Sequence, residues 1–386
     1  MPDGLPQLLL HIPKQPSSSL VRPPSTPLTI NPILTPTGQG VQRVGMTTTW
    51  LEAFPKTCKP FLQEMDHILS TPLSSIIANG PNSTLTATEN AQPAIMATSI
   101  MILRILEQEF NFDTSKRVDV TLGHSLGEFA ALVAAEHLHY PDALKMVRRR
   151  AQVMARCSRE ASASEGGEYG MVALVCEPDR LSSLIATIHD FLGHASPGSR
   201  DDSASDVPPI EQVLIANINS KNQIVLSGSI ERINALLVQL RQFGGHDPRA
   251  VRLLCDSPFH SPLMAPAAAW MRDTLSTTPI HYPGLFPCIS NVSSRPFSSA
   301  KDLQDLLARQ AVETIRWWDS IKFLDQEFGV RRWVGIGPGK VGRNLVGKEV
   351  GMQGADVVRG GGVWGLSHPR EVEGVLRGLE ETEGLA

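Results

Sequence analysis

The sequence contains a motif with the form of a nucleophile elbow, Gly123-His124-Ser125-Leu126-Gly127, which fits the pattern G-x-S-x-G. An apolar stretch with the character of a strand, residues 118–122, precedes it, and an apolar, alanine-rich stretch that predicts a helix begins at Glu128. A nucleophile elbow needs this strand–turn–helix context. The two glycines let the backbone turn sharply, so the Ser125 hydroxyl protrudes at the helix N-terminus, where the Leu126 amide and the helix dipole favour a negative oxygen. The motif therefore predicts a nucleophilic serine, and the alternative is a tight turn in which the serine caps the helix.

A nucleophilic serine needs a base, and the chain offers 11 histidines. His260 lies in a segment punctuated by prolines, residues 255–262, directly after an expected strand. Loops at the ends of strands often carry catalytic groups, so His260 is a candidate base and His368 is its rival. His124 lies beside the serine and points off the elbow, so we expect it to pack or to bind substrate.

A third feature is the run Arg148-Arg149-Arg150 within an expected helix over residues 142–161. A guanidinium can hold a carboxylate through two parallel hydrogen bonds, which the point charge of a lysine cannot reproduce. Runs of three arginines are also typical of the solvated face of a helix. The residues alone leave both interpretations of Arg150 open.

Composition narrows the class of protein. The 386 residues include 35 Lys and Arg against 39 Asp and Glu, and this balance argues against a protein held to nucleic acid mainly by phosphate contacts. No apolar run approaches the roughly 20 residues that a bilayer-spanning helix needs, so no membrane span is expected. The five cysteines are odd in number, widely spread and without a CxxC pair, which favours free thiols over a disulfide framework or a zinc site.

The surrounding pattern predicts an α/β protein that is interrupted by a smaller α+β unit. Residues 48–108 have helical periodicity, and after Gly166 the elements follow the order β-α-β-β-α-β, the signature of a ferredoxin-like module. Within that module, residues 193–212 are small, polar and proline-containing, and they predict a surface loop or disorder. Residues 1–37 are rich in proline, which opposes a helix, and they predict a leader that is disordered or serves in targeting.

Several motifs that occur in one order carry a resemblance to a known family. They are Gly38-Gln39-Gly40-Val41-Gln42 with Gly45-Met46, Glu89-Asn90-Ala91-Gln92-Pro93-Ala94, GHSLGE, Arg150 in RRRAQVM, PFHS, Arg316-Trp317 and Gly337-Pro338-Gly339-Lys340-Val341. From about residue 38 to 350 the chain resembles the malonyl-CoA:acyl carrier protein transacylases, and in particular their fungal mitochondrial member. The acyltransferase domains of polyketide and fatty acid synthases are the nearest relatives of that family. This ordered set is far more specific than G-x-S-x-G alone.

The resemblance assigns the catalytic roles residue by residue. Ser125 matches the family nucleophile, and His260 matches the base that takes its proton and returns it to the leaving thiol. The family has no carboxylate as a third member, and Gln310 matches the position whose backbone carbonyl orients the imidazole. Gln39 and Leu126 match the pair whose backbone amides form the oxyanion hole.

The resemblance also assigns the substrate pocket. Arg150 matches the arginine that binds the free carboxylate of the substrate, and Gln92 matches a polar residue that lines the same pocket. Phe259, which precedes the base, and Leu126, which follows the serine, resemble the pattern that selects malonyl over methylmalonyl. His124 completes the set of expected substrate-binding residues.

Pattern and resemblance together imply an α/β-hydrolase-like large domain, residues 38–164 and 256–386, with an inserted ferredoxin-like small domain, residues 165–255. The active site is expected in the cleft between them. The implied reaction transfers malonyl from malonyl-CoA to the phosphopantetheine thiol of acyl carrier protein through a malonyl-serine, in support of fatty acid synthesis. Neither thiol carrier is a permanent cofactor, so no cofactor and no metal are expected. The implied location is mitochondrial, with the cytoplasm as the alternative.

Two other functions remain open at this stage. A serine esterase needs an acid and a histidine after the elbow, for which Asp319 and His368 are candidates. A catalytically inactive relative is conceivable because the chain departs from the family just before Gln39. There the family has a strand rich in aromatic and aliphatic residues, whereas Leu34-Thr35-Pro36-Thr37 predicts a poorly formed strand. The Gln39 half of the oxyanion hole depends on that strand.

Overall fold

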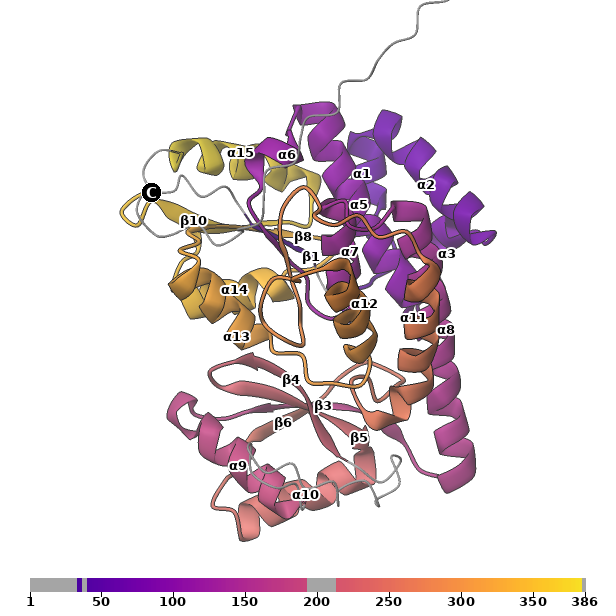
Figure 1. Ribbon diagram of the computed structural model, residues 1–386, viewed down its shortest axis with the longest axis vertical. Helices are drawn as coiled ribbons and strands as arrows, with labels where there is room; N and C mark the ends of the chain where they lie inside the picture. The colour runs from indigo at the N-terminus through magenta and orange to yellow at the C-terminus, as the bar shows by residue number, and fades with distance from the viewer. Residues whose placement is uncertain (1–32, 37–39, 193–212, 384–386) are drawn as a thin grey trace, which may run out of the picture.

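The computed structural model describes residues 33–36, 40–192 and 213–383 (Figure 1). Gln39, the expected loop at residues 193–212 and residues 1–32 of the expected leader lie outside the described residues. Two sheets organise the described chain, one of six strands and one of four, and the smaller sheet lies below the larger one in Figure 1. The chain is a mixed α/β protein, as the sequence predicts.

Every pairing in the six-stranded sheet is parallel except that of the edge strand β9 with β10. In spatial order the strands are β7 (Cys288–Ile289), β2 (Thr121–Leu122), β1 (Ile33–Pro36), β8 (Arg332–Ile336), β10 (Gly361–Leu366) and β9 (Gly354–Asp356). Parallel neighbours need long crossover connections, and helices supply most of these. The sheet therefore brings together residues that are far apart in the sequence.

Strand β1 corrects the prediction of a poorly formed strand. It lies inside the six-stranded sheet, with Leu34 opposite Thr121 of β2 and residues 33–36 opposite 333–336 of β8. Pro36 is its last residue, so the missing N–H falls where the strand ends. The composition of the segment misled the prediction because a short strand between two parallel neighbours is specified largely by those neighbours.

The described residues form helices of very different lengths around the two sheets. In chain order they are α1 (Thr48–Ala53), α2 (Pro55–Leu69), α3 (Leu73–Asn79), α4 (Asn82–Thr86), α5 (Thr88–Phe110), α6 (Thr114–Arg117), α7 (Gly127–Ala134), α8 (Tyr140–Glu165), α9 (Leu181–Phe191), α10 (Ile230–Gln242), α11 (Ala265–Thr277), α12 (Ala300–Arg309), α13 (Trp317–Lys322), α14 (Val341–Val350) and α15 (Val372–Glu381). None of them has both the length and the apolar character that a membrane-spanning helix needs.

Both faces of the six-stranded sheet are covered, because successive residues of a strand point to opposite faces. On β8, Val334 and Ile336 join the larger core, which includes residues of α5, α7, α8 and α15. Trp333 of the same strand joins a smaller core with residues of α13 and α14. The short strand β2 and the elbow that follows it are therefore enclosed between two helical layers.

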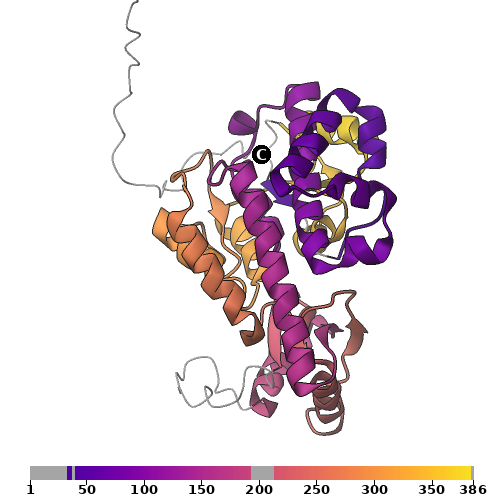
Figure 2. The ribbon, with the colours of Figure 1, turned by 90° about the vertical axis from the view of Figure 1, so that its right-hand side faces the viewer.

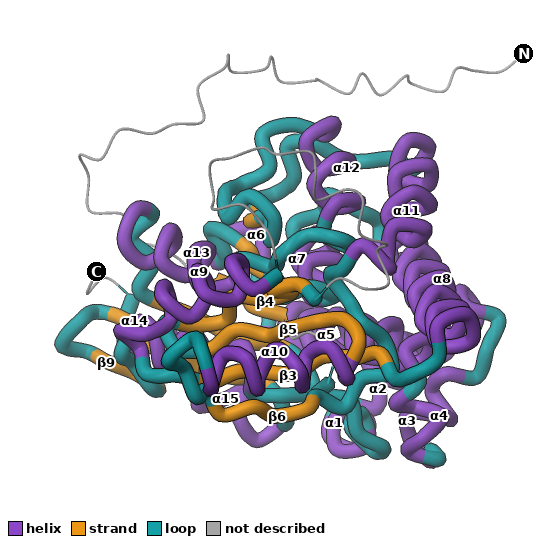
Figure 3. Tube along the Cα trace, turned by 90° about the horizontal axis from the view of Figure 1, so that it is seen from below, coloured by secondary structure: helices purple, strands orange, loops and turns teal. Residues whose placement is uncertain are grey.

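The four-stranded sheet is antiparallel, in the order β4 (Leu214–Ser220), β5 (Gln223–Ser229), β3 (Tyr169–Val175) and β6 (Arg249–Arg252). With α9 and α10, these strands follow the expected chain order β-α-β-β-α-β. Val172 and Leu174 face α9 and α10, which cover one side of the sheet (Figure 3). Met171 and Ala173 face the other side, where they pack with residues of α8 and α11.

Two connections hold the small sheet against the rest of the chain. Helix α8, the long magenta helix in Figure 2, packs against α5 at one end and against β3 at the other. In addition, Asn217 of β4 forms an isolated parallel bridge with Ile315, just before α13. The region between the sheets is therefore bordered by β4, α8 and the turn that carries Ser125.

Candidate active site

The serine of the G-x-S-x-G motif lies in a strained turn between β2 and α7. Ser125 has a φ of 52°, a conformation that L-residues other than glycine rarely adopt. The turn is so tight that a Cβ atom on Gly123 would lie 2.0 Å from the backbone carbon of Gly127, so glycine is required there. The elbow predicted from the sequence is therefore formed, with the serine directly before helix α7.

The structure brings Ser125 and His260 together across 135 residues of sequence. Ser125 Oγ lies 2.7 Å from His260 Nε2, and His260 Nδ1 lies 2.7 Å from the backbone carbonyl oxygen of Gln310. Since a carbonyl can only accept, Nδ1 carries the proton and Nε2 is left to accept from the serine hydroxyl. This geometry places a neutral imidazole where a general base must be, and a backbone carbonyl where a triad has its carboxylate.

Arg150 is buried beside this pair, which excludes the interpretation of a solvated arginine. Its side chain is 2 % exposed. Nη1 donates to Gln92 Oε1 at 2.8 Å, and Nη2 donates to Gln310 Oε1 at 2.9 Å. Gln92 and Gln310 are thus joined through the guanidinium, and the same Gln310 contacts Arg150 with its side chain and His260 with its backbone.

Two residues that the sequence reasoning did not select hold the elbow in place. Asn291, which follows β7, accepts a hydrogen bond from the Ser125 N–H at 2.6 Å and donates from Nδ2 to the Gly123 carbonyl at 2.7 Å. Glu128, in the first turn of α7, accepts from the Asn291 N–H at 3.1 Å and from Gln310 Nε2 at 2.6 Å. Glu128 had a signal in the sequence, because it is the last residue of the motif GHSLGE, whereas Asn291 had little beyond its place at a strand end.

Burial without full charge pairing shifts the pKa values of the three ionisable groups. Burial, reinforced by the positive charge of Arg150, lowers the pKa of His260 to about 3. Burial also lowers the pKa of Arg150 to about 10, although the charge of Glu128 opposes this. The pKa of Glu128 is raised to about 8 by burial, against hydrogen bonds from Gln310 and Asn291. At neutral pH the His260 imidazole is therefore neutral and the Arg150 guanidinium is charged, which are the states that proton abstraction and carboxylate binding would require.

The remaining expected substrate residues lie in different surroundings. His124 Nε2 lies 3.0 Å from Asn219 Oδ1, and its ring packs edge-on against Trp317, so the side chain faces β4 of the small sheet. Burial lowers the pKa of His124. Phe259 is buried in the core between the small sheet, α8 and α11, where it packs with Met154.

Of the two residues expected to form an oxyanion hole, the structure describes one. Leu126 occupies the N-cap position of α7, and within the described residues its N–H has no hydrogen-bond acceptor. Gln39, the other expected member, lies outside the described residues. The Leu126 amide is thus positioned next to the serine and at the positive end of a helix dipole.

The residues proposed for a serine esterase do not join this site. Asp319 forms an ion pair with Lys322, at 2.9 Å on the same helix. His368 caps the 3-10 turn at 369–371, where Nδ1 accepts from the Arg370 N–H at 3.2 Å. His260 is therefore the histidine that the structure places against Ser125.

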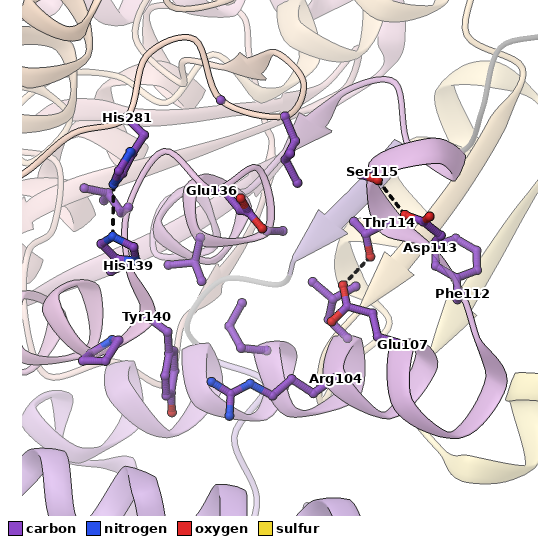
Figure 4. Close-up of a pocket in the computed structure, with 18 of the residues that line it drawn as sticks. Arg104, Glu107, Phe112, Asp113, Thr114, Ser115, Glu136, His139, Tyr140 and His281 are labelled. Carbon is purple, nitrogen blue, oxygen red and sulfur yellow. Dashed lines mark hydrogen bonds between the residues drawn. The ribbon is translucent and has the colours of Figure 1, made fainter. Parts of the chain in front are cut away.

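A cavity of about 1030 Å³ lies elsewhere, at the C-terminal part of α5 (Figure 4). Two pairs of its polar groups are in contact: Glu107 accepts from Thr114 Oγ1 at 2.6 Å, and His139 Nε2 lies 3.0 Å from His281 Nε2. Glu107 follows Gln92 by fifteen residues on α5, which is roughly 22 Å along a helix. None of the expected site residues is among the described residues that line it, and no group of three His, Cys, Asp or Glu within the described chain could hold a metal ion.

Comparison with known proteins finds relatives along most of the chain. Residues 36–187 match the model of the acyl transferase domain. The malonyl CoA-acyl carrier protein transacylase of Bacillus subtilis is 33% identical over 344 residues, which cover 89% of this chain and 96% of the relative. The protein of the same name from Haemophilus influenzae is 29% identical over 81% of this chain and 90% of its own length.

Solved structures agree with these matches. The acyl-carrier-protein S-malonyltransferase from Bartonella henselae superposes with a TM-score of 0.74 at 31% identity, over 91% of this chain and 100% of the other. The malonyl CoA-acyl carrier protein transacylase from Clostridium perfringens gives a TM-score of 0.72 at 26% identity, over 92% of this chain and 98% of the other.

Proposed function

Because this chain belongs to the malonyl-CoA:acyl carrier protein transacylase family, we propose that it moves malonyl from malonyl-CoA to the phosphopantetheine thiol of acyl carrier protein, in support of fatty acid synthesis. The observation that carries the proposal is the chain of contacts from Ser125 through His260 to Gln310, with Arg150 bound to the same Gln310. A nucleophile, its base and a cation for the free carboxylate are thereby joined in one buried cluster.

In the first half of the reaction, His260 Nε2 takes the proton from Ser125 Oγ as the oxygen attacks the thioester carbonyl carbon of malonyl-CoA. The negative oxygen of the tetrahedral intermediate accepts from the Leu126 N–H, and losing one such donor typically costs roughly 3 kcal/mol of transition-state stabilisation. The carbon–sulfur bond then breaks, and His260 returns the proton to the coenzyme A thiolate. In the second half the phosphopantetheine thiol gives its proton to His260 and attacks the carbonyl carbon of malonyl-serine. The bond between that carbon and Ser125 Oγ then breaks, and His260 returns the proton to the serine oxygen, so the enzyme is regenerated and the reaction is ping-pong.

Arg150 supplies recognition of the substrate in this scheme. Malonyl differs from acetyl by one carboxylate, and a buried carboxylate needs a charged partner. The guanidinium is already desolvated and held between two amide oxygens, so it binds the carboxylate without first losing its own hydration. Gln92 lines the same pocket, and we assign the selection of malonyl to Arg150 and Gln92 together. The roles of His124, Phe259 and Gln39 in this scheme rest on the resemblance to the family.

The reaction is tested by incubating the protein with radiolabelled malonyl-CoA. We expect label on Ser125 that discharges to phosphopantetheinylated acyl carrier protein. Ser125→Ala and His260→Ala should both abolish labelling, whereas Ser276→Ala, at an exposed position of α11, should leave it unchanged. Rapid release of malonate to water with His260→Ala fully active would contradict the proposal in favour of an esterase, and no labelling of folded wild-type protein would favour an inactive relative.

The proposal extends to architecture and location. The large domain is α/β-hydrolase-like, residues 38–164 and 256–386, and the inserted small domain, residues 165–255, is ferredoxin-like. The strand order β4-β5-β3-β6 with both helices on one face supports the second assignment. We propose a mitochondrial location on the resemblance to the fungal mitochondrial member of the family and on the composition of residues 1–37, with the cytoplasm as the alternative. Cell fractionation with mass spectrometry of the mature N-terminus tests it.

A further inference from the structure

Glu128 is the feature of the site that the proposed mechanism leaves without a role. It lies in the first turn of α7, three residues after the nucleophile, and its side chain is 0 % exposed. Both of its oxygens accept hydrogen bonds, Oε1 from the Asn291 N–H and Oε2 from Gln310 Nε2. A buried carboxylate is costly to maintain, and its contacts here lead directly to the catalytic residues.

Gln310 is the residue through which those contacts converge. Its Nε2 donates to Glu128 Oε2 and to the Ser125 carbonyl oxygen at 2.8 Å, and its Oε1 accepts from Arg150. Its backbone carbonyl accepts from His260. The position of this one residue therefore sets the orientation of both the base and the substrate-binding arginine.

An amide side chain can turn by 180°, which exchanges its donor and its acceptor. Glu128 as a carboxylate only accepts, and Arg150 on the other side of the amide only donates. These two neighbours together make one orientation of Gln310 favourable and the other unfavourable. Without the carboxylate, the Nε2 side of the amide would keep a single acceptor, the Ser125 carbonyl.

We infer that Glu128 is a positioning residue of the transferase reaction, which fixes the Gln310 amide and through it couples the binding of the substrate carboxylate at Arg150 to the alignment of His260 on Ser125. This inference rests on the proposed function. Glu128 touches neither the substrate nor the reacting atoms, so it acts through Gln310.

The inference is tested by a double-mutant cycle between positions 128 and 310. The rate constant of Ser125 acylation by malonyl-CoA is measured in single turnover for wild type, Glu128→Gln, Gln310→Met and the double variant. The assay is run at pH 8.5, because burial raises the pKa of Glu128 and the inference concerns its carboxylate form. Glutamine at 128 can accept from Gln310 only by turning its own amide donor toward the Asn291 N–H. We expect it to slow acylation roughly ten- to hundredfold, the cost of one mismatched buried donor. Methionine at 310 keeps the backbone carbonyl and removes the side-chain contacts.

If Glu128 acts through Gln310, the double variant is slowed by no more than about threefold relative to Gln310→Met, because the two positions belong to one network. If the acylation rate of the double variant is instead lowered by the product of the factors found for the two single variants, Glu128 stabilises the elbow independently of Gln310 and the inference is overturned. The amplitude of the turnover counts folded enzyme, so a loss of folded protein is separated from a loss of rate. Where Glu128→Gln does not fold, Glu128→Asp, which keeps the charge but is shorter by one methylene, takes its place in the same cycle with the same two outcomes.

Glu107→Gln is the control for the same chemical change outside the site. Glu107 is an exposed carboxylate that accepts a hydrogen bond from a threonine hydroxyl rather than from the catalytic network, and it lines the cavity of Figure 4. Its replacement should leave the acylation rate unchanged within about twofold. Failure of the proposed function would appear differently, as wild-type protein that forms no acyl-enzyme from malonyl-CoA at all.

Discussion

Replacing Arg150 by alanine should convert the protein from a malonyl-selective to an acetyl-tolerant acyltransferase. The magnitude follows from the burial of the guanidinium and from its pKa of about 10, which keeps it charged at the pH of an assay. Removing it leaves the substrate carboxylate in a buried pocket without a cationic partner. A buried charge that loses its partner costs about 3–5 kcal/mol, which corresponds to a loss of roughly a hundred- to several-thousandfold in kcat/KM for malonyl-CoA.

Acetyl-CoA has no such carboxylate, so its transfer should be spared or raised. The assay measures transfer from both donors to acyl carrier protein with the same enzyme sample, and the ratio of the two kcat/KM values does not depend on the fraction of folded protein. Arg149→Ala is the matched control, because Arg149 is the exposed neighbour in the same helix and its side chain donates a hydrogen bond to Gln152 Oε1, at 3.3 Å, rather than to Gln92 or Gln310. It should leave the ratio unchanged within about twofold. An equal loss on both donors with Arg150→Ala would refute the reasoning and make the arginine a structural residue.

Three further predictions follow from the elbow and the base. The pKa of His260 in the folded state, about 3, lies below its value of about 6.5 in the unfolded state, so between these pH values the unfolded state binds one more proton. As the pH falls from 6.5 toward 4, the unfolding free energy of wild type should therefore fall by about 1.4 kcal/mol per pH unit more than that of His260→Gln. Urea titration of both proteins measures this difference. Gly123→Ala should destabilise the protein by several kcal/mol and abolish acyl-enzyme formation, because the new Cβ would overlap Gly127. Gly374→Ala, in open space on α15, should be neutral or stabilising by up to about 1 kcal/mol. Equal melting temperatures for the two variants would contradict this prediction. Ser125→Gly should be more stable than Ser125→Ala by roughly 1 kcal/mol, because alanine keeps the strain of the positive φ and glycine relieves it; calorimetry of these two inactive variants decides.

Much of the site could be predicted because its key residues sit in motifs whose geometry is local. The elbow around Ser125 is specified by glycines within four residues, and the ordered motifs were sufficient to select His260, Gln310 and Arg150. What the sequence could not supply is the set of contacts made only by packing. Asn291 accepts a hydrogen bond from the Ser125 N–H although the two residues are 166 positions apart in the sequence, and no sequence pattern near Asn291 indicates this contact.

The error on β1 has a related physical cause. Residues 33–36 end in a proline and contain no aromatic residue, and they follow a proline-rich stretch, so the composition of the segment argued against a strand. In the sheet, β2 and β8 flank this segment, and each offers it backbone hydrogen bonds in parallel register. Long-range pairing overrides local propensity most easily for short strands, because few residues of the segment itself are needed. Residues 34–37 therefore differ from the expected family pattern in sequence, but the strand β1 that this difference put in doubt is present in the sheet.

The arrangement of charges suggests why such a site needs no carboxylate behind its histidine. In the proposed mechanism, the imidazolium that forms during attack is stabilised by the Gln310 carbonyl and opposed by the charge of Arg150, which is one of the causes of the low pKa of His260. When a malonyl carboxylate binds Arg150, it neutralises much of that opposing charge, so His260 becomes a stronger base at the moment when the correct substrate is present. Acetyl leaves the arginine charge unbalanced and meets a weaker base. Selectivity would then arise in the chemical step as well as in binding. The same charge effect is the physical reason why acetyl transfer by Arg150→Ala should be spared or raised and not lowered.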